Sequence, residues 1–293
     1  MNQNFGELAR GATQLRVDLR KGDITVNSGS GPEWNLEWTS DGNESPEMHR
    51  EGDLMIVRQR PRHGEHKGTS ARRTDVRISI PNRVKSVELQ TGLGRVQAAG
   101  VEGRLALNTG NGAVTLHASR GEAILRSGNG ELSVEDHEGH LTASTGNGRV
   151  SVHRLKGGLD LNTGNGRIEA VEVEGEVRAS TGNGQVHLAR AAGEAELNTA
   201  HGQVEISDPV ALLARATSAA GSVHVSGGSL RGLRVNSTMG GVKCSSLLEA
   251  GSYDLSSHMG SIELDLSTRA TARIDAQTGF GQVESDFPLV RVG

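Results

Sequence analysis

The chain has 293 residues, of which 41 are glycine and only six are aromatic. Apolar residues make up 34% of the sequence, well below the usual share for a globular domain, which argues against a core of large side chains. Six prolines and regularly spaced aliphatic residues argue against disorder, and a net charge of −4 gives no general attraction to nucleic acid.

Residues 1–90 predict an atypical β-rich cap that includes the first coils of a repeating structure, because they lack the glycine pattern of the rest of the chain. Five segments are strand-like: 14–20, 23–27, 34–40, 53–60 and 75–80. No segment predicts a helix. Trp34, Leu36 and Trp38 alternate on one face of the third segment. We interpret them as a core beneath the cap, with an exposed carbohydrate-stacking pair as the alternative.

An 18-residue repeat begins after the cap. The tetrad Thr-Gly-Asn-Gly, or a close variant, recurs at a constant 18-residue interval and starts at Thr91, Thr109, Ser127, Thr145, Thr163, Thr181 and Thr199. Each unit predicts two short strands and two turns, because glycine supplies positive φ angles and room for close backbone contact. Residues 91–216 are therefore predicted to form regular 18-residue coils.

Alternating aliphatic residues predict one apolar and one polar face for each strand. In the unit that starts at Thr145, Val150 and Val152 share a face of the first strand, and Leu159 and Leu161 share the same face of the second. Equivalent positions of the other regular units hold only Val, Leu, Ile or Ala. The interior is expected to be narrow, which accounts for the scarcity of aromatic residues.

Two architectures fit this pattern: an antiparallel meander, which Asn-Gly turns ordinarily suggest, and a solenoid of stacked parallel coils. Two sets of charged residues recur at 18-residue spacing with alternating sign. The first charge column is Glu102, Arg120, Glu138, Lys156 and Glu174, and the second charge column is Asp136, Arg154, Glu172, Arg190 and Asp208. Alternation is useful where these residues are direct neighbours about 4.8 Å apart, because like charges would repel. We therefore predict an all-β, single-stranded parallel β-solenoid built from 18-residue coils of two strands each.

The third residue of the tetrad predicts a ladder along one edge of this solenoid. Five consecutive units place asparagine there: Asn111, Asn129, Asn147, Asn165 and Asn183. Stacked amide side chains hydrogen-bond to one another and tie neighbouring coils together. Roughly eleven coils at about 4.8 Å each would give a rod about 50 Å long.

Beyond Thr199 the repeat loosens. Tetrad-like starts follow at wider and less regular intervals, at Ser218, Thr238, Ser257 and Thr278. Residues 217–293 therefore predict looser coils and the C-terminal end, where an open solenoid exposes unpaired backbone groups. Four apolar residues near the C-terminus either cover the last coil or form an adhesive end for another copy: Phe280, Phe287, Leu289 and Val290.

The segments TDVRISIP and SVELQTGLGRVQAAGVEG, followed by serial LNTGNG and ASTGNG units, resemble the bacterial β-strand-repeat family of candidate adhesins, a domain family of unknown function. The resemblance covers roughly residues 14–285. It implies a right-handed parallel β-solenoid and, in many members, a place at the cell envelope. A looser likeness, in architecture alone, is to bactofilins, whose β-helical units stack end to end into cytoplasmic filaments.

No arrangement of residues predicts catalysis, a metal site or a cofactor site. The sequence has no zincin helix motif, credible nucleophile elbow or phosphate-binding loop. His117 and His153 share a column but are two coils, about 10 Å, apart, which is too far for one metal ion. We expect a protein that is not an enzyme and that holds no metal or cofactor.

The cap contains a basic cluster with Glu65 as the only acidic residue among its members: Arg58, Arg60, Arg62, Lys67, Arg72 and Arg73. One interpretation is a solvated hairpin loop. The other is contact with an anionic partner, such as nucleic acid, lipid headgroups or an acidic face of another copy. No interleaved aromatic residues support base stacking, so a nucleic-acid partner is disfavoured.

The sequence also predicts a chain without a membrane span. No uncharged apolar run approaches the roughly 18 residues of a transmembrane helix, and the first twenty residues lack the apolar core of a signal peptide. We expect a cytoplasmic location, with association with the cell envelope as the alternative. Cys244 is the single cysteine and lies two residues after Val242 in an inward column, so we interpret it as a buried structural thiol.

These features predict a non-catalytic structural or scaffolding protein that acts through contacts with itself or another protein and assembles end to end. The alternative is a binding module for an anionic polymer, an envelope polysaccharide or a membrane surface. Such a module would use the side faces or the Arg-rich cap loop.

Overall fold

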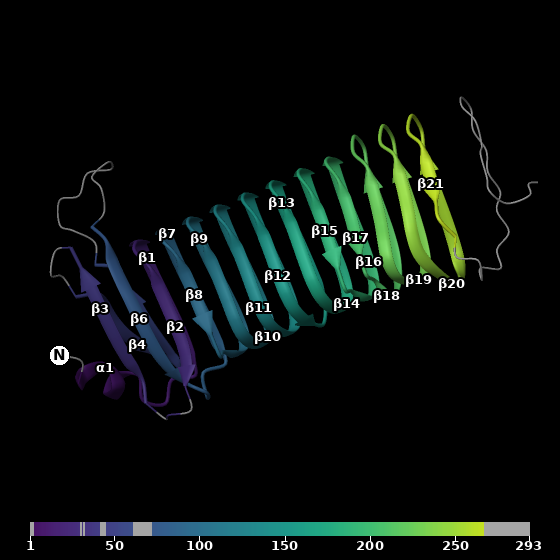
Figure 1. Cartoon of the computed structure of the whole chain (residues 1–293). Coiled ribbons are helices and arrows are strands. Elements are labelled where there is room, and N and C mark those ends of the chain that lie inside the picture. The colour runs from purple at the N-terminus through teal and green to yellow at the C-terminus, as the bar shows by residue number, and fades with distance from the viewer. Residues whose placement is uncertain (1–2, 30, 32, 42–44, 61–71, 267–293) are drawn as a thin grey trace, which may run out of the picture.

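The computed structural model describes residues 3–29, 31, 33–41, 45–60 and 72–266, which form one rod of stacked β-coils (Figure 1). Neighbouring coils pair in parallel one repeat apart, so Val114 lies opposite Leu132, and Leu132 lies opposite Val150. The parallel β-solenoid expected from the charge columns is confirmed. A meander is excluded, because its neighbouring strands would be antiparallel.

The first coil of the chain does not lie at the end of the rod. The N-terminal elements are α1 (Gln3–Leu8), β1 (Gln14–Lys21), β2 (Ile24–Gly29), β3 (Asn35–Ser40), β4 (Glu47–Glu51), β5 (Leu54–Arg58), β6 (Thr74–Pro81), β7 (Ser86–Leu93) and β8 (Val96–Ala99). Strand β1 pairs in parallel with both β5 and β7, and β2 pairs in parallel with both β6 and β8. The β1–β2 coil is therefore enclosed between two coils that follow it in the sequence.

Two antiparallel strands close the N-terminal end of the rod. Strand β3 pairs with β6 and β4 pairs with β5, and α1 packs against both added strands. Helix α1 and strand β4 were not expected from the sequence, and the expectation of no helix is wrong. Both elements are short, and they are stabilised by contact with the terminal coil that they cover rather than by a pattern in their own sequence. Antiparallel strands and a helix end the parallel stacking, as solenoid caps do.

The cap aromatic residues form a core. Trp34 and Leu36 are buried, and the Phe5 ring of α1 meets the Trp34 ring edge-on, with centroids 6.0 Å apart and an interplanar angle of 81°. Trp38 is half-buried against the same core. The interpretation of Trp34 and Leu36 as core is confirmed, and the carbohydrate-stacking alternative is excluded for Trp34.

The regular coils follow along the rod. Their strands are β9 (Glu102–Asn111), β10 (Val114–Asn129), β11 (Leu132–Asn147), β12 (Val150–Lys156), β13 (Leu159–Asn165), β14 (Ile168–Asn183), β15 (Val186–Ala189), β16 (Ala192–His201), β17 (Val204–Ser207) and β18 (Val210–Ser218). The two strands expected for a coil join into one 16-residue strand in β10, β11 and β14, because pairing with neighbouring coils continues round the turn. At that turn Asp136, Arg154 and Glu172 have left-handed backbones, with φ of 57°, 55° and 58°. We call this side of the rod the corner edge.

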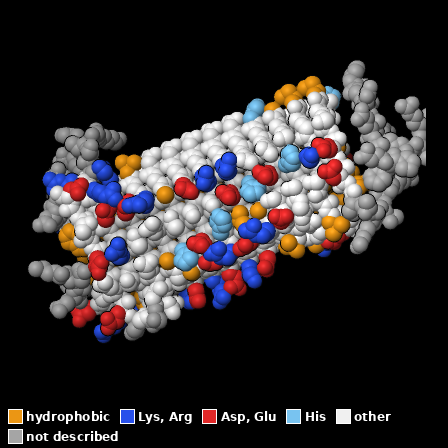
Figure 2. Space-filling view, viewed as in Figure 1, with side chains coloured by type: hydrophobic (Ala, Val, Ile, Leu, Met, Phe, Trp, Pro, Cys, Tyr) orange, Lys and Arg blue, Asp and Glu red, His pale blue; other side chains and the backbone are white. Residues whose placement is uncertain are grey.

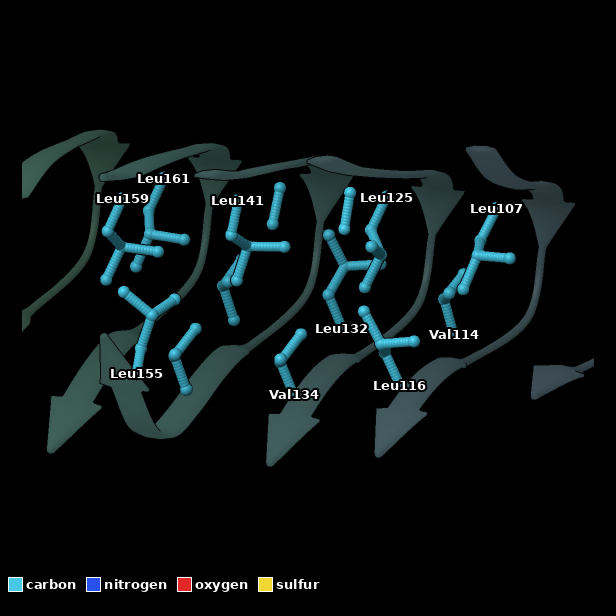
Figure 3. Packing of buried hydrophobic residues seen from close by; sticks show 14 of the residues in the cluster. Leu107, Val114, Leu116, Leu125, Leu132, Val134, Leu141, Leu155, Leu159 and Leu161 are labelled. Atoms are coloured by element: carbon cyan, nitrogen blue, oxygen red, sulfur yellow. The ribbon is translucent and has the colours of Figure 1, made fainter. Parts of the chain in front are cut away.

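The core runs along the inside of the rod between the two strand layers. Figure 3 shows side chains of both layers, such as Leu125 and Leu132, pointing into this interior. Leu125, Leu132 and Leu141 have no exposed surface, and the core of the regular coils contains only Val, Leu, Ile and Ala, apart from the turn residues described below. The narrow aliphatic interior expected from the sequence is confirmed.

The tetrads form the opposite side of the rod, which we call the tetrad edge. The buried hydroxyl of Thr145 donates a hydrogen bond to the Gly130 carbonyl of the preceding coil, with Oγ1 to O at 3.1 Å. The Asn147 amide donates to the Asn129 Oδ1 at 2.8 Å, and the same bond joins the other asparagines of the column. The predicted amide ladder is confirmed. From Asn111 to Asn183, each coil is thus joined to the previous one through a side-chain hydroxyl and a side-chain amide.

The later coils contain β19 (Val223–Ser237), β20 (Val242–Ser257) and β21 (Ile262–Leu264). Ser237, rather than Thr238, occupies the threonine column, since it pairs with Ser218 and Ser257 and its hydroxyl donates to the Gly221 carbonyl at 3.2 Å. The assignment of a tetrad start to Thr238 is therefore wrong by one residue. Two adjacent hydroxyl residues made the sequence ambiguous there. The start assigned to Thr278 lies outside the described residues.

Cys244 is buried in β20, and burial raises the pKa of its thiol. The interpretation of this cysteine as a buried structural thiol is confirmed.

Candidate interaction surfaces

The two charge columns lie side by side along the corner edge. In the first, Arg120 contacts Glu138 at 2.6 Å and Lys156 contacts Glu174 at 3.6 Å. In the second, Arg154 Nε lies 2.6 Å from Asp136, and Arg190 lies 3.1 Å from Glu172. The hydrogen bond from Arg154 lowers the pKa of Asp136. The expectation that these residues are direct neighbours on stacked coils is confirmed.

A shallow groove of about 650 Å³ runs between the two charge columns. Its walls are charged side chains of both columns, and its floor includes Ser119, His137 and Leu155, which are buried turn residues. These floor residues belong to a column that points inward at the corner edge. The groove is therefore polar at its rim and closed at its base.

A buried polar pair interrupts the floor of the groove. Six residues form the inward turn column: Val101, Ser119, His137, Leu155, Val173 and Ala191. Ser119 and His137 are polar, and the other four are apolar. The Ser119 hydroxyl lies 2.8 Å from His137 Nδ1, while His137 Nε2 has no hydrogen-bond partner among the described residues. Sequence reasoning missed this pair. The available signal was the polar substitution of two neighbouring members of an aliphatic column.

His137 is expected to make folding sensitive to mild acid. Burial lowers the pKa of its imidazole, so the unfolded chain takes up a proton near pH 6.5 while the folded chain does not. The free energy of unfolding therefore has its full value above about pH 6.5. It falls as the pH drops toward the folded-state pKa, by at most about 1.4 kcal/mol per pH unit for one proton. Urea denaturation at pH 7.5 and 5.5 should show a smaller loss for His137→Leu, which copies the equivalent Leu155.

The matched control for this prediction is His201→Asn, which replaces an exposed imidazole by the residue found at the same position of the preceding coils. It should retain the acid-dependent loss of the parent chain. An unchanged loss in His137→Leu would contradict the assignment of the effect to this histidine.

The basic cluster of the cap is divided by the structure. Arg58, Arg60 and Arg72 are exposed, and Arg60 Nε lies 3.6 Å from Glu47. Arg73 instead contacts Asp23 at 2.7 Å and Asp75 at 2.9 Å. Arg62 and Lys67 lie outside the described residues. Three of the four described arginines are therefore exposed, and Arg73 is partly buried.

Arg73 belongs to an ion network that connects the outer coils of the cap. Burial raises the pKa of Asp23, but the backbone hydrogen bond from Arg95 and the charges of Arg73 and Arg95 outweigh it, so the pKa lies below its ordinary value. The hydrogen bond to Asp75 raises the pKa of Arg73. Asp23 of the β1–β2 coil is thus joined to the coils on both sides, which indicates a structural role for Arg73.

The tetrad edge changes from polar to apolar toward the C-terminal end. The position held by asparagine in the regular coils holds Ala220, Met239 and Met259 in the later ones. Met239 and Met259 are 55% and 65% exposed. Figure 2 shows hydrophobic side chains gathered on this end of the edge. The C-terminal residues considered for end-to-end contact, Phe280, Phe287, Leu289 and Val290, lie outside the described residues.

The described part of the chain contains no helix long and apolar enough to cross a membrane. Within the same residues, no group of three or more His, Cys, Asp or Glu side chains is arranged to hold a metal ion.

The fold and its edges define a class of protein: a parallel β-solenoid with 18-residue coils and repeated polar side-chain ladders. Residues 12–292 match the model of the Toastrack DUF4097 family, and the chain belongs to this family. No curated protein matches the chain. Among solved structures, a candidate cell adhesion protein from Clostridium sporogenes is similar at 10% identity and a TM-score of 0.21, covering 88% of this chain and 94% of that protein.

Proposed function

We propose that this protein is a non-catalytic, adhesin-like scaffold that binds other proteins along a rigid rod and assembles with itself through its ends. The observation that carries the proposal is the repetition of side-chain pairing along both edges, as in the asparagine ladder and the two charge columns. A surface that repeats about every 4.8 Å suits an extended or repeating protein partner better than one small substrate. The solenoid fold and the family membership support a structural role.

The two ends of the rod differ in how well they suit assembly. Antiparallel β3 and β4 cover the N-terminal end, where they interrupt parallel pairing. At the last described coil, Met259 and Ile262 are 65% and 45% exposed. We therefore place the self-association surface at the C-terminal end of the rod.

Electron microscopy over a concentration series tests this assembly. We expect particles longer than one rod at high concentration, and fewer of them for Met259→Glu/Ile262→Glu, because charge at the apolar end opposes desolvation. The matched control is Leu93→Glu, which changes an exposed leucine far from that end. Single rods of one length at every concentration would contradict self-assembly through the ends.

A second function, binding of an anionic polymer or membrane surface, is favoured by the exposure of Arg58, Arg60 and Arg72 in the cap. We expect the protein to sediment with vesicles that contain anionic lipid at low salt and to be released at high salt. Arg58→Gln/Arg60→Gln should reduce sedimentation at least several-fold. Arg104→Gln/Arg178→Gln removes the same charge from exposed side-face arginines and should not. Equal binding by both variants would contradict a cap site.

A further inference from the structure

The corner edge carries its charges in bands that cross the groove. Each band consists of the members of the two charge columns that belong to one coil, and these share one sign. Asp136 and Glu138 form an acidic band, and Arg154 and Lys156 form the next band, which is basic. The residue between the two members of a band is buried, so both charged side chains lie outward. Figure 2 shows the two columns as rows of alternating blue and red along the lower part of the rod.

The alternation continues over seven coils without a break, from Glu102 to Asp208. The coil of Glu102 carries a single acidic residue and precedes the six bands that are numbered here from Arg120. The first of these six is basic through Arg120, and the last two are basic through Arg190 and acidic through Asp208. Between them lie the two bands described above and the acidic band of Glu172 and Glu174. The order is therefore basic, acidic, basic, acidic, basic, acidic. Bands of the same sign recur every two coils, or about 9.6 Å.

We propose that the corner edge docks onto the corner edge of a second copy of this chain, with the two rods antiparallel. The two-fold axis lies between the coil of Arg154 and the coil of Glu172. The third band of one rod then faces the fourth of the other, the second faces the fifth, and the first faces the sixth. Every basic band meets an acidic band, and the contact is isologous, so both copies use the same surface.

The charge order selects this orientation. In a parallel two-fold pair each band would face its own copy, so Arg154 and Lys156 would meet Arg154 and Lys156. Like charges placed together across an interface oppose association. An antiparallel pair with its axis through a coil would also place bands of one sign together. Only axes between coils match opposite signs, and the stated axis matches all six bands from Arg120 to Asp208, with Glu102 beyond the matched stretch.

A second copy is the partner that this surface fits best. A uniformly charged polymer would meet a repelling band about every 9.6 Å along the edge. A second copy of the chain has bands at the same spacing, because its sequence is the same. The contact is narrow compared with a standard interface, and each exposed ion pair contributes little, so the dimer is weak and sensitive to salt. This lateral contact deepens the proposed scaffold role and does not depend on the ends of the rod.

Sedimentation velocity of the full chain is the first test. We expect a concentration-dependent dimer at about 50 mM salt that dissociates at about 500 mM salt, because screening weakens exposed charge pairs. A monomer at every concentration at low salt would overturn the proposal. Electron microscopy of the same samples reports on assembly through the ends separately, so either contact can fail while the other stands.

Charge-segregated variants give the sharper test. Arg154→Glu/Lys156→Glu makes the third band acidic like the fourth, and Glu172→Lys/Glu174→Lys makes the fourth basic like the third. Neither variant should form a dimer alone, whereas a mixture should form a heterodimer, since all facing bands are again opposite. Failure of the mixture to associate, with both variants folded by circular dichroism, would overturn the proposal.

A neutral variant covers the case in which reversed charges disturb folding. Arg154→Gln/Lys156→Gln should weaken the dimer about tenfold or more, because it removes one side of two facing band pairs. The matched control is Arg104→Gln/Arg178→Gln, which lies outside the charge columns and should leave the dimer unchanged. Equal weakening by both variants would overturn the assignment to the corner edge.

Disulfide cross-linking tests the orientation. In the antiparallel pair, Ala118 faces Asp208 of the other copy, so a mixture of Ala118→Cys and Asp208→Cys should cross-link. Ala118→Cys alone should not, since its two copies lie about five coils, or about 24 Å, apart. Native Cys244 is buried and contributes little background. Self-cross-linking of Ala118→Cys would indicate a parallel pair and overturn the proposal.

Discussion

Gly148→Ala is expected to destabilise the rod by about 3 kcal/mol, through a backbone clash combined with a strained φ angle. A Cβ atom at Gly148 would lie 2.1 Å from the carbonyl oxygen of Gly130, and the residue has a φ of 155°. That carbonyl also accepts the hydrogen bond from Thr145, so it cannot move without loss of this bond. The measurement is the free energy of unfolding from urea denaturation followed by circular dichroism.

The matched control for Gly148→Ala is Gly29→Ala at the end of β2, where a Cβ atom meets nothing within 4 Å. This control should change stability by less than about 0.5 kcal/mol. Similar losses in both variants would show that general glycine replacement, rather than stacking of the tetrad glycines, controls the effect.

Leu141→Ala is expected to cost about 3 kcal/mol, because it leaves a cavity in an interior only two layers thick. Leu141 has no exposed surface and lies between Ala123 and Leu159 of the adjacent coils. The neighbouring small side chain of Ala123 cannot fill the space. Urea denaturation measures the loss, and Thr142→Ala, which changes the outward side chain next to Leu141, should cost less than about 1 kcal/mol. A loss for Leu141→Ala no larger than this control would contradict the importance of core packing here.

The regular coils could be predicted because their stabilising contacts recur at one sequence interval. Thr145 and Asn147 contact residues of the preceding coil, and the charge columns pair across the same interval. The 18-residue spacing therefore predicts both the strand positions and the register in which neighbouring coils pair. The cap follows no such interval. The enclosure of the β1–β2 coil depends on pairing between strands far apart in the sequence, since Leu15 lies between Met55 and Val87, and no local pattern reveals this.

The interaction surfaces were predictable only in part. Each charge column was visible in the sequence. The bands were not, because they form only when the two columns lie on the same edge and place two residues of one sign side by side. The Ser119–His137 pair was hidden because two polar residues in an aliphatic column look like tolerated exceptions. In the folded chain they are neighbours on adjacent coils, which allows the hydroxyl to satisfy the imidazole Nδ1.

The enclosed β1–β2 coil determines the order in which the rod can be completed. Both of its sides remain open until β5–β6 has added on one side and β7–β8 on the other, so the start of the rod grows in two directions. From β9 onward each coil adds to a finished neighbour that is only one repeat earlier in the chain, which is a short loop to close. We therefore expect formation of the rod to divide into a slow assembly of the N-terminal coils and a stepwise extension that proceeds toward the C-terminus.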